Sequence, residues 1–86
     1  MTHTVTLIGK PGCHLCDDAR AAIERVLAQL PQTASVTLDE ASILDDDVLY
    51  QRYWEQIPVV LVDGEQHTFW RVDEQRLAIA LTGHDV

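Results

Sequence analysis

Both cysteines of this chain fall in one short segment, Gly9-Lys10-Pro11-Gly12-Cys13-His14-Leu15-Cys16. The residues before it, Thr4–Ile8, alternate in polarity and are rich in β-branched side chains, which predicts a β-strand. After the turn residues, apolar side chains recur every three or four positions from His14 to Leu30. That spacing predicts an amphipathic helix of about four turns, ended by Pro31. The cysteines are therefore expected at a strand-to-helix junction.

Five further elements are predicted from the rest of the sequence. They are a short strand at Ala34–Leu38, a helix that begins at Asp45-Asp46-Asp47 and runs to Trp54, a strand at Pro58–Val62, a strand at Gln66–Trp70, and a helix that follows Asp73 and ends near Gly83. The unbroken apolar run Pro58–Val62 is typical of a strand buried on both faces. Asp63-Gly64 after it predicts a hairpin to an edge strand. The order β-α-β-α-β-β-α predicts an α/β sandwich, formed as one domain over residues 1–86.

The charge balance narrows the range of partners. Fourteen acidic residues against six basic ones give a formal net charge of −8. Such a surface repels phosphate backbones and anionic membranes, so neither nucleic acid nor a membrane is expected as a partner. The longest apolar run, Ile57–Val62, is too short to span a bilayer. Residues 1–4 lack the basic and apolar regions of a signal peptide, so the cytoplasm is the expected compartment.

The Cys13–Cys16 spacing predicts a redox-active pair. Cys13 falls at the start of a helix, where free backbone N–H groups and the helix dipole stabilise a thiolate. Cys16 follows one turn later, where it can attack a mixed disulfide formed on Cys13. We therefore predict that Cys13 is the catalytic nucleophile and that Cys16 is the resolving cysteine.

Other uses of the cysteines remain open. A zinc or iron–sulfur site needs further ligands, and the histidines, His3, His14, His67 and His84, are scattered without ligand spacing, so no metal ligand is predicted. Haem attachment needs a histidine where Asp17 stands. Inert core cysteines would lie on the apolar helix stripe, which Cys16 partly fits and Cys13 does not. An interaction domain with idle thiols is a further alternative. The acidic triplet 45–47 is expected to be a solvated helix start, with a metal site as the alternative.

The sequence resembles the glutaredoxin-like family of the thioredoxin superfamily. The resemblance rests on the segment 9–16, on Gln56-Ile57-Pro58-Val59-Val60 and on Asp63-Gly64, and it covers nearly the whole chain. It implies a minimal thioredoxin-like sandwich, in which a four-stranded mixed sheet carries helices on both faces. It also implies that Pro58 is cis beside the cysteines and that the backbone of Ile57 is exposed for strand-like pairing with a substrate. The alternative is a trans proline that merely starts the strand.

The resemblance further implies a substrate site. Lys10 matches the residue that faces a glutathione carboxylate, and Asp73 matches the acid that meets the glutathione amino group. His14, beside the nucleophile, completes the expected substrate-binding residues. Taken by themselves, Lys10 is equally a solvated loop lysine, Asp73 a helix N-cap and His14 a surface histidine.

The implied activity is that of a thiol–disulfide oxidoreductase in electron transport and cell redox homeostasis. Its expected substrates are protein disulfides or glutathione mixed disulfides, with no bound cofactor and with glutathione as the reductant. The chain departs from glutaredoxins in two places: His14-Leu15 replaces Pro-Tyr between the cysteines, and Phe69–Asp73 replaces a Gly-Gly pair. The bulky residues at 70 and 71 make recycling by thioredoxin reductase the second expectation. A non-catalytic zinc or iron–sulfur module is the third. A monomer is expected, because a redox shuttle must present Cys13 to many partners.

Overall fold

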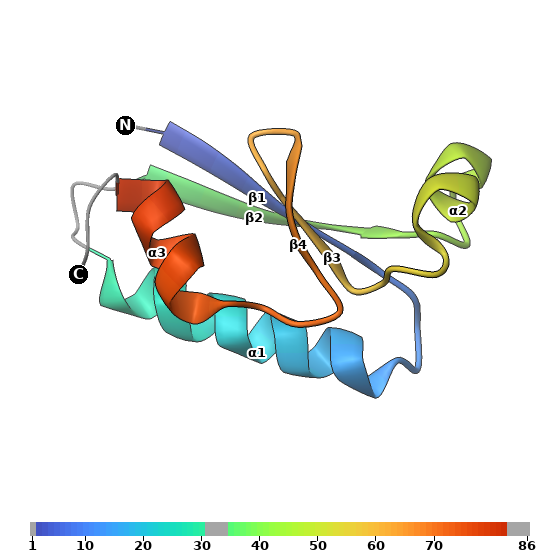
Figure 1. Ribbon diagram of the computed structural model, residues 1–86, viewed down its shortest axis with the longest axis horizontal. Helices are drawn as coiled ribbons and strands as arrows, with labels where there is room; N and C mark the ends of the chain where they lie inside the picture. The colour runs from blue at the N-terminus through green and yellow to red at the C-terminus, as the bar shows by residue number, and fades with distance from the viewer. Residues whose placement is uncertain (1, 31–34, 83–86) are drawn as a thin grey trace.

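The computed structural model describes residues 2–30 and 35–82, and its elements follow the predicted order (Figure 1). They are β1 (Thr2–Gly9), α1 (His14–Gln29), β2 (Ser35–Ser42), α2 (Asp47–Tyr53), β3 (Val59–Val62), β4 (Glu65–Phe69) and α3 (Glu74–Thr82). No helix within these residues is long and apolar enough to cross a membrane. The predicted positions Pro31, Ala34, Gly83 and His84 lie outside the described residues.

The four strands form one mixed sheet in the order β2-β1-β3-β4. β1 and β2 run parallel because the long helix α1 connects them, whereas β1–β3 and β3–β4 are antiparallel. Asp63 and Gly64 join β3 to β4 with φ angles of 52° and 86°. Two positive φ angles are typical of the tight hairpin turns that match strand twist, so the hairpin prediction is confirmed.

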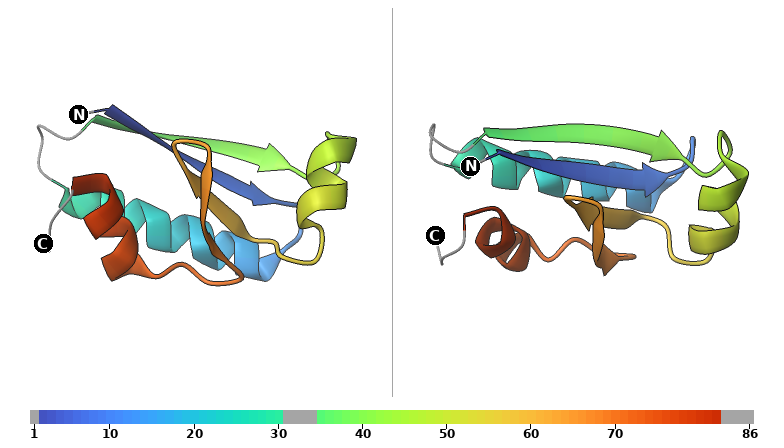
Figure 2. Two further views of the ribbon diagram at one scale, coloured as in Figure 1. Left: turned by 45° about the horizontal axis from the view of Figure 1, so that its top comes forward. Right: turned by 90° about the horizontal axis from the view of Figure 1, so that it is seen from above.

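The alternation of side chains along the strands divides the core between the two faces of the sheet. On one face α1 and α3 pack on the strands, and α2 packs at the end of the sheet on the other face (Figures 1 and 2). The first cluster contains Val5, Leu7, Ala19, Ile23, Val26, Val60, Leu77 and Leu81. The second contains Ile8, Ile43, Tyr53 and Val59. The predicted sandwich with helices on both faces is confirmed.

Two acidic side chains cap the shorter helices. Asp46 accepts hydrogen bonds from the N–H groups of Val48 (2.9 Å) and Leu49 (3.2 Å) at the start of α2. Asp73 accepts one from the N–H of Arg76 (3.0 Å) at the start of α3. These bonds satisfy donors that a helix end otherwise leaves free. The acidic triplet at 45–47 is therefore a helix start, as expected.

The bounds of all four strands differ from the prediction. β1 runs from Thr2 to Gly9 instead of Thr4–Ile8, because its parallel pairing with β2 continues over all eight residues. β2 continues to Ser42 instead of ending at Leu38, because its exposed acidic end is held in register by the parallel pairing with β1 and not by burial. β3 begins at Val59, one residue after the proline. β4 ends at Phe69, because Trp70 has a φ of 66° and leaves the strand.

Candidate functional site

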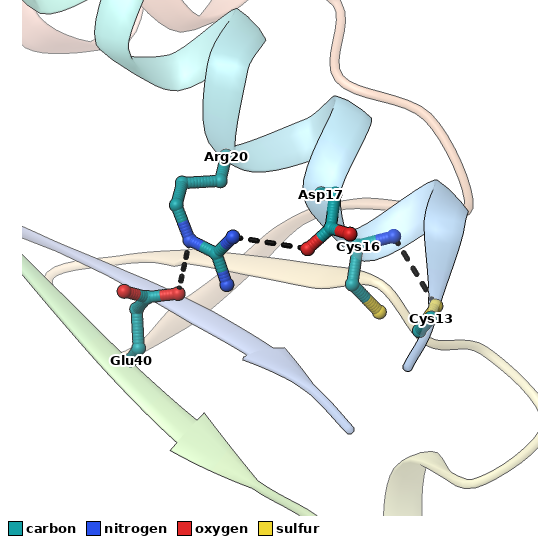
Figure 3. A network of polar contacts seen from close by, with 5 residues as sticks. All are labelled: Cys13, Cys16, Asp17, Arg20 and Glu40. Carbon is teal, nitrogen blue, oxygen red and sulfur yellow. Dashed lines mark hydrogen bonds and ion pairs between the residues drawn. The ribbon is translucent and has the colours of Figure 1, made fainter. Parts of the chain in front are cut away.

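The sulfur of Cys13 occupies the N-cap position of α1. Cys13 has extended backbone angles (φ −93°, ψ 112°), and its carbonyl accepts the N–H of Asp17 at 3.1 Å. Its Sγ accepts a hydrogen bond from the N–H of Cys16 at 3.2 Å (Figure 3). The first turn of a helix has unpaired N–H groups and the positive end of the dipole, so a negative sulfur is stabilised at this point.

The turn before Cys13 sets this geometry. Gly12 has a φ of 77°, in the left-handed region that glycine enters without steric cost. Pro11 and Gly12 are exposed and Cys13 is half-buried, so Cys13 lies between an exposed turn and the interior of the molecule. The expected strand–turn–helix junction is therefore present.

Cys16 lies one turn further and is almost fully enclosed, with 3% of its surface exposed. Burial, together with the hydrogen bond and charge of Cys13, raises the pKa of the Cys16 thiol from 9.0 to about 11, although a hydrogen bond from the Lys10 backbone acts in the opposite direction. Both cysteines are free thiols. The pair thus combines a partly exposed cysteine, Cys13, with a buried one, Cys16, that keeps its proton at neutral pH.

Pro58 lies at the same end of the sheet as the cysteines. Val59 pairs with Ile8 at the end of β1, so the residue before it is next to the start of the Gly9–Cys16 segment. The Ile57–Pro58 bond is cis, as the resemblance implied. The Ile57 N–H donates to the Tyr53 carbonyl (3.1 Å), and the Ile57 carbonyl has no backbone hydrogen-bond partner among the described residues. Pairing of Ile57 with a substrate strand stays a prediction.

The remaining predicted site residues are spread over a wider surface. Lys10 lines an open groove of about 350 Å³ whose floor includes Cys16. His14 is exposed on the first turn of α1. Asp73 is exposed, and one of its oxygens forms the α3 cap described above. Substrate roles for these residues remain predictions.

An ion-pair network that sequence reasoning missed borders the same groove. Arg20 donates to Asp17 (3.0 Å) and to Glu40 (2.6 Å), and so connects α1 to β2 (Figure 3). The carboxylates hold the pKa of Arg20 above its ordinary value, with Glu40 the larger cause. The spacing of three residues between Asp17 and Arg20 is visible in the sequence. The partner on β2 is not, because it depends on the strand register.

The sequence analysis also did not predict the structural role of Trp70, which lies where β4 ends. Its φ of 66° is in the region that favours glycine, yet it carries a large side chain that is 56% exposed. Its N–H donates to the Pro58 carbonyl (2.8 Å), and its indole Nε1 donates to the Glu55 carbonyl (3.0 Å). The indole also lines a groove of about 350 Å³ along α1, which includes Leu15. Trp70 is therefore hydrogen-bonded through both of its N–H groups to residues 55–58, the loop that contains Pro58 (the proline loop).

Within residues 2–30 and 35–82, no three His, Cys, Asp or Glu side chains are close enough together to hold a metal ion.

Comparisons with known proteins agree with this geometry. A protein-family model described as "Glutaredoxin-like domain (DUF836)" matches residues 4–82. Uncharacterized proteins of Mycobacterium tuberculosis and Mycobacterium bovis are each 30% identical over 74 residues, which is 85% of this chain and 76% of theirs.

Solved structures show the same fold. A Nitrosomonas europaea protein studied by NMR has a TM-score of 0.75 at 22% identity, covering 93% of this chain and 92% of its own. A crystal structure of a Xanthomonas protein (X. campestris) has a TM-score of 0.70 at 28% identity, covering 93% and 97%. A mutant thioredoxin from Halobacterium salinarum has a TM-score of 0.64 at 16% identity, covering 98% and 75%.

Proposed function

Because this chain belongs to the glutaredoxin-like domain family, we propose that it is a thiol–disulfide oxidoreductase whose Cys13 and Cys16 reduce protein disulfides or glutathione mixed disulfides. The family and the nearby cysteine pair support a redox function in general. The assignment of roles to the two sulfurs is the finer part of the proposal.

One observation carries the proposal: the Cys16 N–H donates to the Cys13 Sγ at 3.2 Å. A hydrogen bond to sulfur favours the thiolate over the thiol, and the thiolate is the nucleophile in disulfide exchange. The same bond places the two cysteines within one helical turn, with the buried one behind the reachable one.

The proposed reaction has two exchange steps. The Cys13 thiolate attacks a substrate disulfide, forms a mixed disulfide and releases one substrate thiolate. Cys16 then loses its proton to solvent and attacks the Cys13 sulfur, so that the Cys13–Cys16 bond forms and the second substrate thiolate leaves. The substrate gains two electrons and the protein dithiol loses two. A separate reductant must restore the dithiol.

A second candidate concerns that reductant. In place of the expected Gly-Gly pair, Trp70 stands beside the proline loop with a fixed indole. A bulky side chain there keeps a small peptide away from the backbone, which favours recycling by thioredoxin reductase over recycling by glutathione. The discriminating assay is NADPH consumption with each reducing system. Turnover with glutathione and its reductase alone would contradict this second candidate.

Trapping of the mixed disulfide tests the proposal. Cys16→Ser should accumulate a covalent adduct on Cys13 when mixed with a disulfide substrate, because the second step is then blocked. Cys13→Ser is the matched control and should form none. Adduct formation on Cys16 in the Cys13→Ser protein, at the rate of the wild type, would contradict the assigned roles. Stoichiometric zinc or iron in anaerobically purified protein, lost on Cys16→Ser, would favour the metal-binding alternative.

A further inference from the structure

The backbone of Gly9 lies directly against the sulfur of Cys16. A Cβ placed on Gly9 would be 2.6 Å from the Cys16 Sγ and 3.1 Å from its Cβ. Gly9 is buried and is the last residue of β1. Its φ lies outside the left-handed region, so glycine is not required there by backbone conformation. The space that a side chain would fill is taken by the resolving cysteine.

Both sides of this contact are fixed by the fold. Gly9 pairs with Ser42 in the parallel ladder, and its carbonyl accepts the N–H of Ile43 at 2.9 Å. On the helix side, the first turn is held by two bonds to Cys13: the Asp17 N–H to its carbonyl and the Cys16 N–H to its sulfur. These bonds hold the local conformation of each backbone, and the Cys16 sulfur is the atom nearest to the added Cβ, so we expect the Cys16 side chain to be displaced first.

We propose that Gly9 is a positioning residue, whose missing side chain leaves the Cys16 sulfur in place to attack Cys13. This inference rests on the proposed function. With alanine at position 9, the sulfur would have to move by about 0.8 Å to reach an ordinary contact of 3.4 Å. Rotation of Cys16 does not fully relieve the crowding, because its own Cβ is also within 3.1 Å. A misplacement of about 1 Å can cost roughly 100-fold in the rate of an intramolecular step.

The step affected is the second exchange. Cys16 loses a proton to solvent and attacks the Cys13 sulfur of the mixed disulfide. The Cys13–Cys16 bond forms, the bond from Cys13 to the substrate sulfur breaks, and the substrate leaves as a thiolate that takes up a proton. The first exchange uses only Cys13. No atom of Cys13 is within 4 Å of a Cβ placed on Gly9, so the substitution does not crowd the nucleophile.

Single-turnover kinetics of Gly9→Ala with glutathionylated peptide as the probe test this proposal. Adduct formation on Cys13 should stay within about twofold of the wild type, while release of the second thiol slows tenfold or more and the adduct accumulates. Gly64→Ala is the control for general destabilisation: a Cβ at this distant hairpin glycine has no atom within 4 Å, but its φ of 86° strains an alanine, so stability should fall while both exchange rates stay unchanged. An unchanged release rate in Gly9→Ala would overturn the proposal, as would equal slowing of both steps.

If Gly9→Ala folds too poorly for kinetics, a stability measurement tests the contact between Gly9 and Cys16 instead. Urea titrations are compared for Gly9→Ala in the wild-type chain and in a Cys16→Ala chain, where the sulfur is absent. The substitution should raise the unfolding equilibrium constant at least tenfold more in the wild-type background, since contacting residues couple. Equal effects in both backgrounds would overturn the proposal. This coupling does not depend on disulfide chemistry, so a chain that reduces no disulfide refutes the proposed function without deciding the role of Gly9.

Discussion

The buried thiol of Cys16 predicts that the reduced protein loses stability in alkaline solution. Burial raises the pKa of this thiol from 9.0 to about 11, so the folded chain keeps a proton that the unfolded chain has already released. Between these two values the unfolded state binds fewer protons, and the free energy of unfolding therefore falls as the pH rises. Below pH 9 the stabilisation is fully present, and above pH 11 it is lost.

The magnitude follows from the two pKa values. At about 1.36 kcal/mol for each pKa unit, the difference between 9.0 and about 11 corresponds to a loss of roughly 2–3 kcal/mol in the free energy of unfolding. Cys16 is 3% exposed, so little of this is screened by solvent. The expected loss is a large part of the stability of a small domain, which is typically about 5–15 kcal/mol.

Urea unfolding of the reduced protein, followed from about pH 8 to about pH 11.5, measures this loss. Cys16→Ala is the matched control, because groups that do not interact with Cys16 contribute alike to both proteins and cancel, so the difference measures Cys16 together with its coupling to Cys13. The wild type should lose about 2–3 kcal/mol more than the variant. Parallel curves for the two proteins would refute the reasoning, since the Cys16 thiol would then titrate alike in the folded and unfolded chains.

Three substitutions give simpler outcomes. Asp46→Ala should lower the free energy of unfolding by about 1 kcal/mol, because its carboxylate accepts the two cap hydrogen bonds of α2. Urea titration against Asp47→Ala, whose carboxylate accepts neither bond, checks this, and equal losses would contradict it. Arg20→Met should cost less than about 1 kcal/mol, because its ion pairs are solvent-exposed; a larger loss in the same titration would show that the network is structural. Trp70→Gly should raise turnover with glutathione and glutathione reductase several-fold, measured by NADPH oxidation. Trp54→Ala, at an indole that is also half-exposed (51%), should not, and equal effects would mean that Trp70 does not limit access.

The elements were predictable where local pattern and burial agree. Three features depend only on residues close together in the sequence, and each is found in the structure: the apolar stripe of α1, the Asp63-Gly64 turn and the Asp73 cap. The end of β2 was not predictable, because its acidic residues pair with β1 without burying an apolar face. Strand register is a long-range property that periodicity does not carry.

The position of the candidate site was predictable, and its packing was less so. The sequence predicted that both cysteines lie at a strand-to-helix junction, and the structure has them there. The contact of Gly9 with Cys16 and the ion pair of Arg20 with Glu40 depend on how separate elements meet. A glycine in a turn-rich segment looks like a turn residue, so its role against the buried sulfur emerged only from the three-dimensional arrangement.

The most direct test of the central claim is the fate of the two thiols in one turnover. Fully reduced protein is mixed with an equimolar glutathionylated peptide at neutral pH, quenched with acid and analysed by mass spectrometry. The account predicts a transient adduct on Cys13, followed by an intramolecular Cys13–Cys16 disulfide and released glutathione. Two thiols that stay reduced, or an adduct that first appears on Cys16, would contradict it.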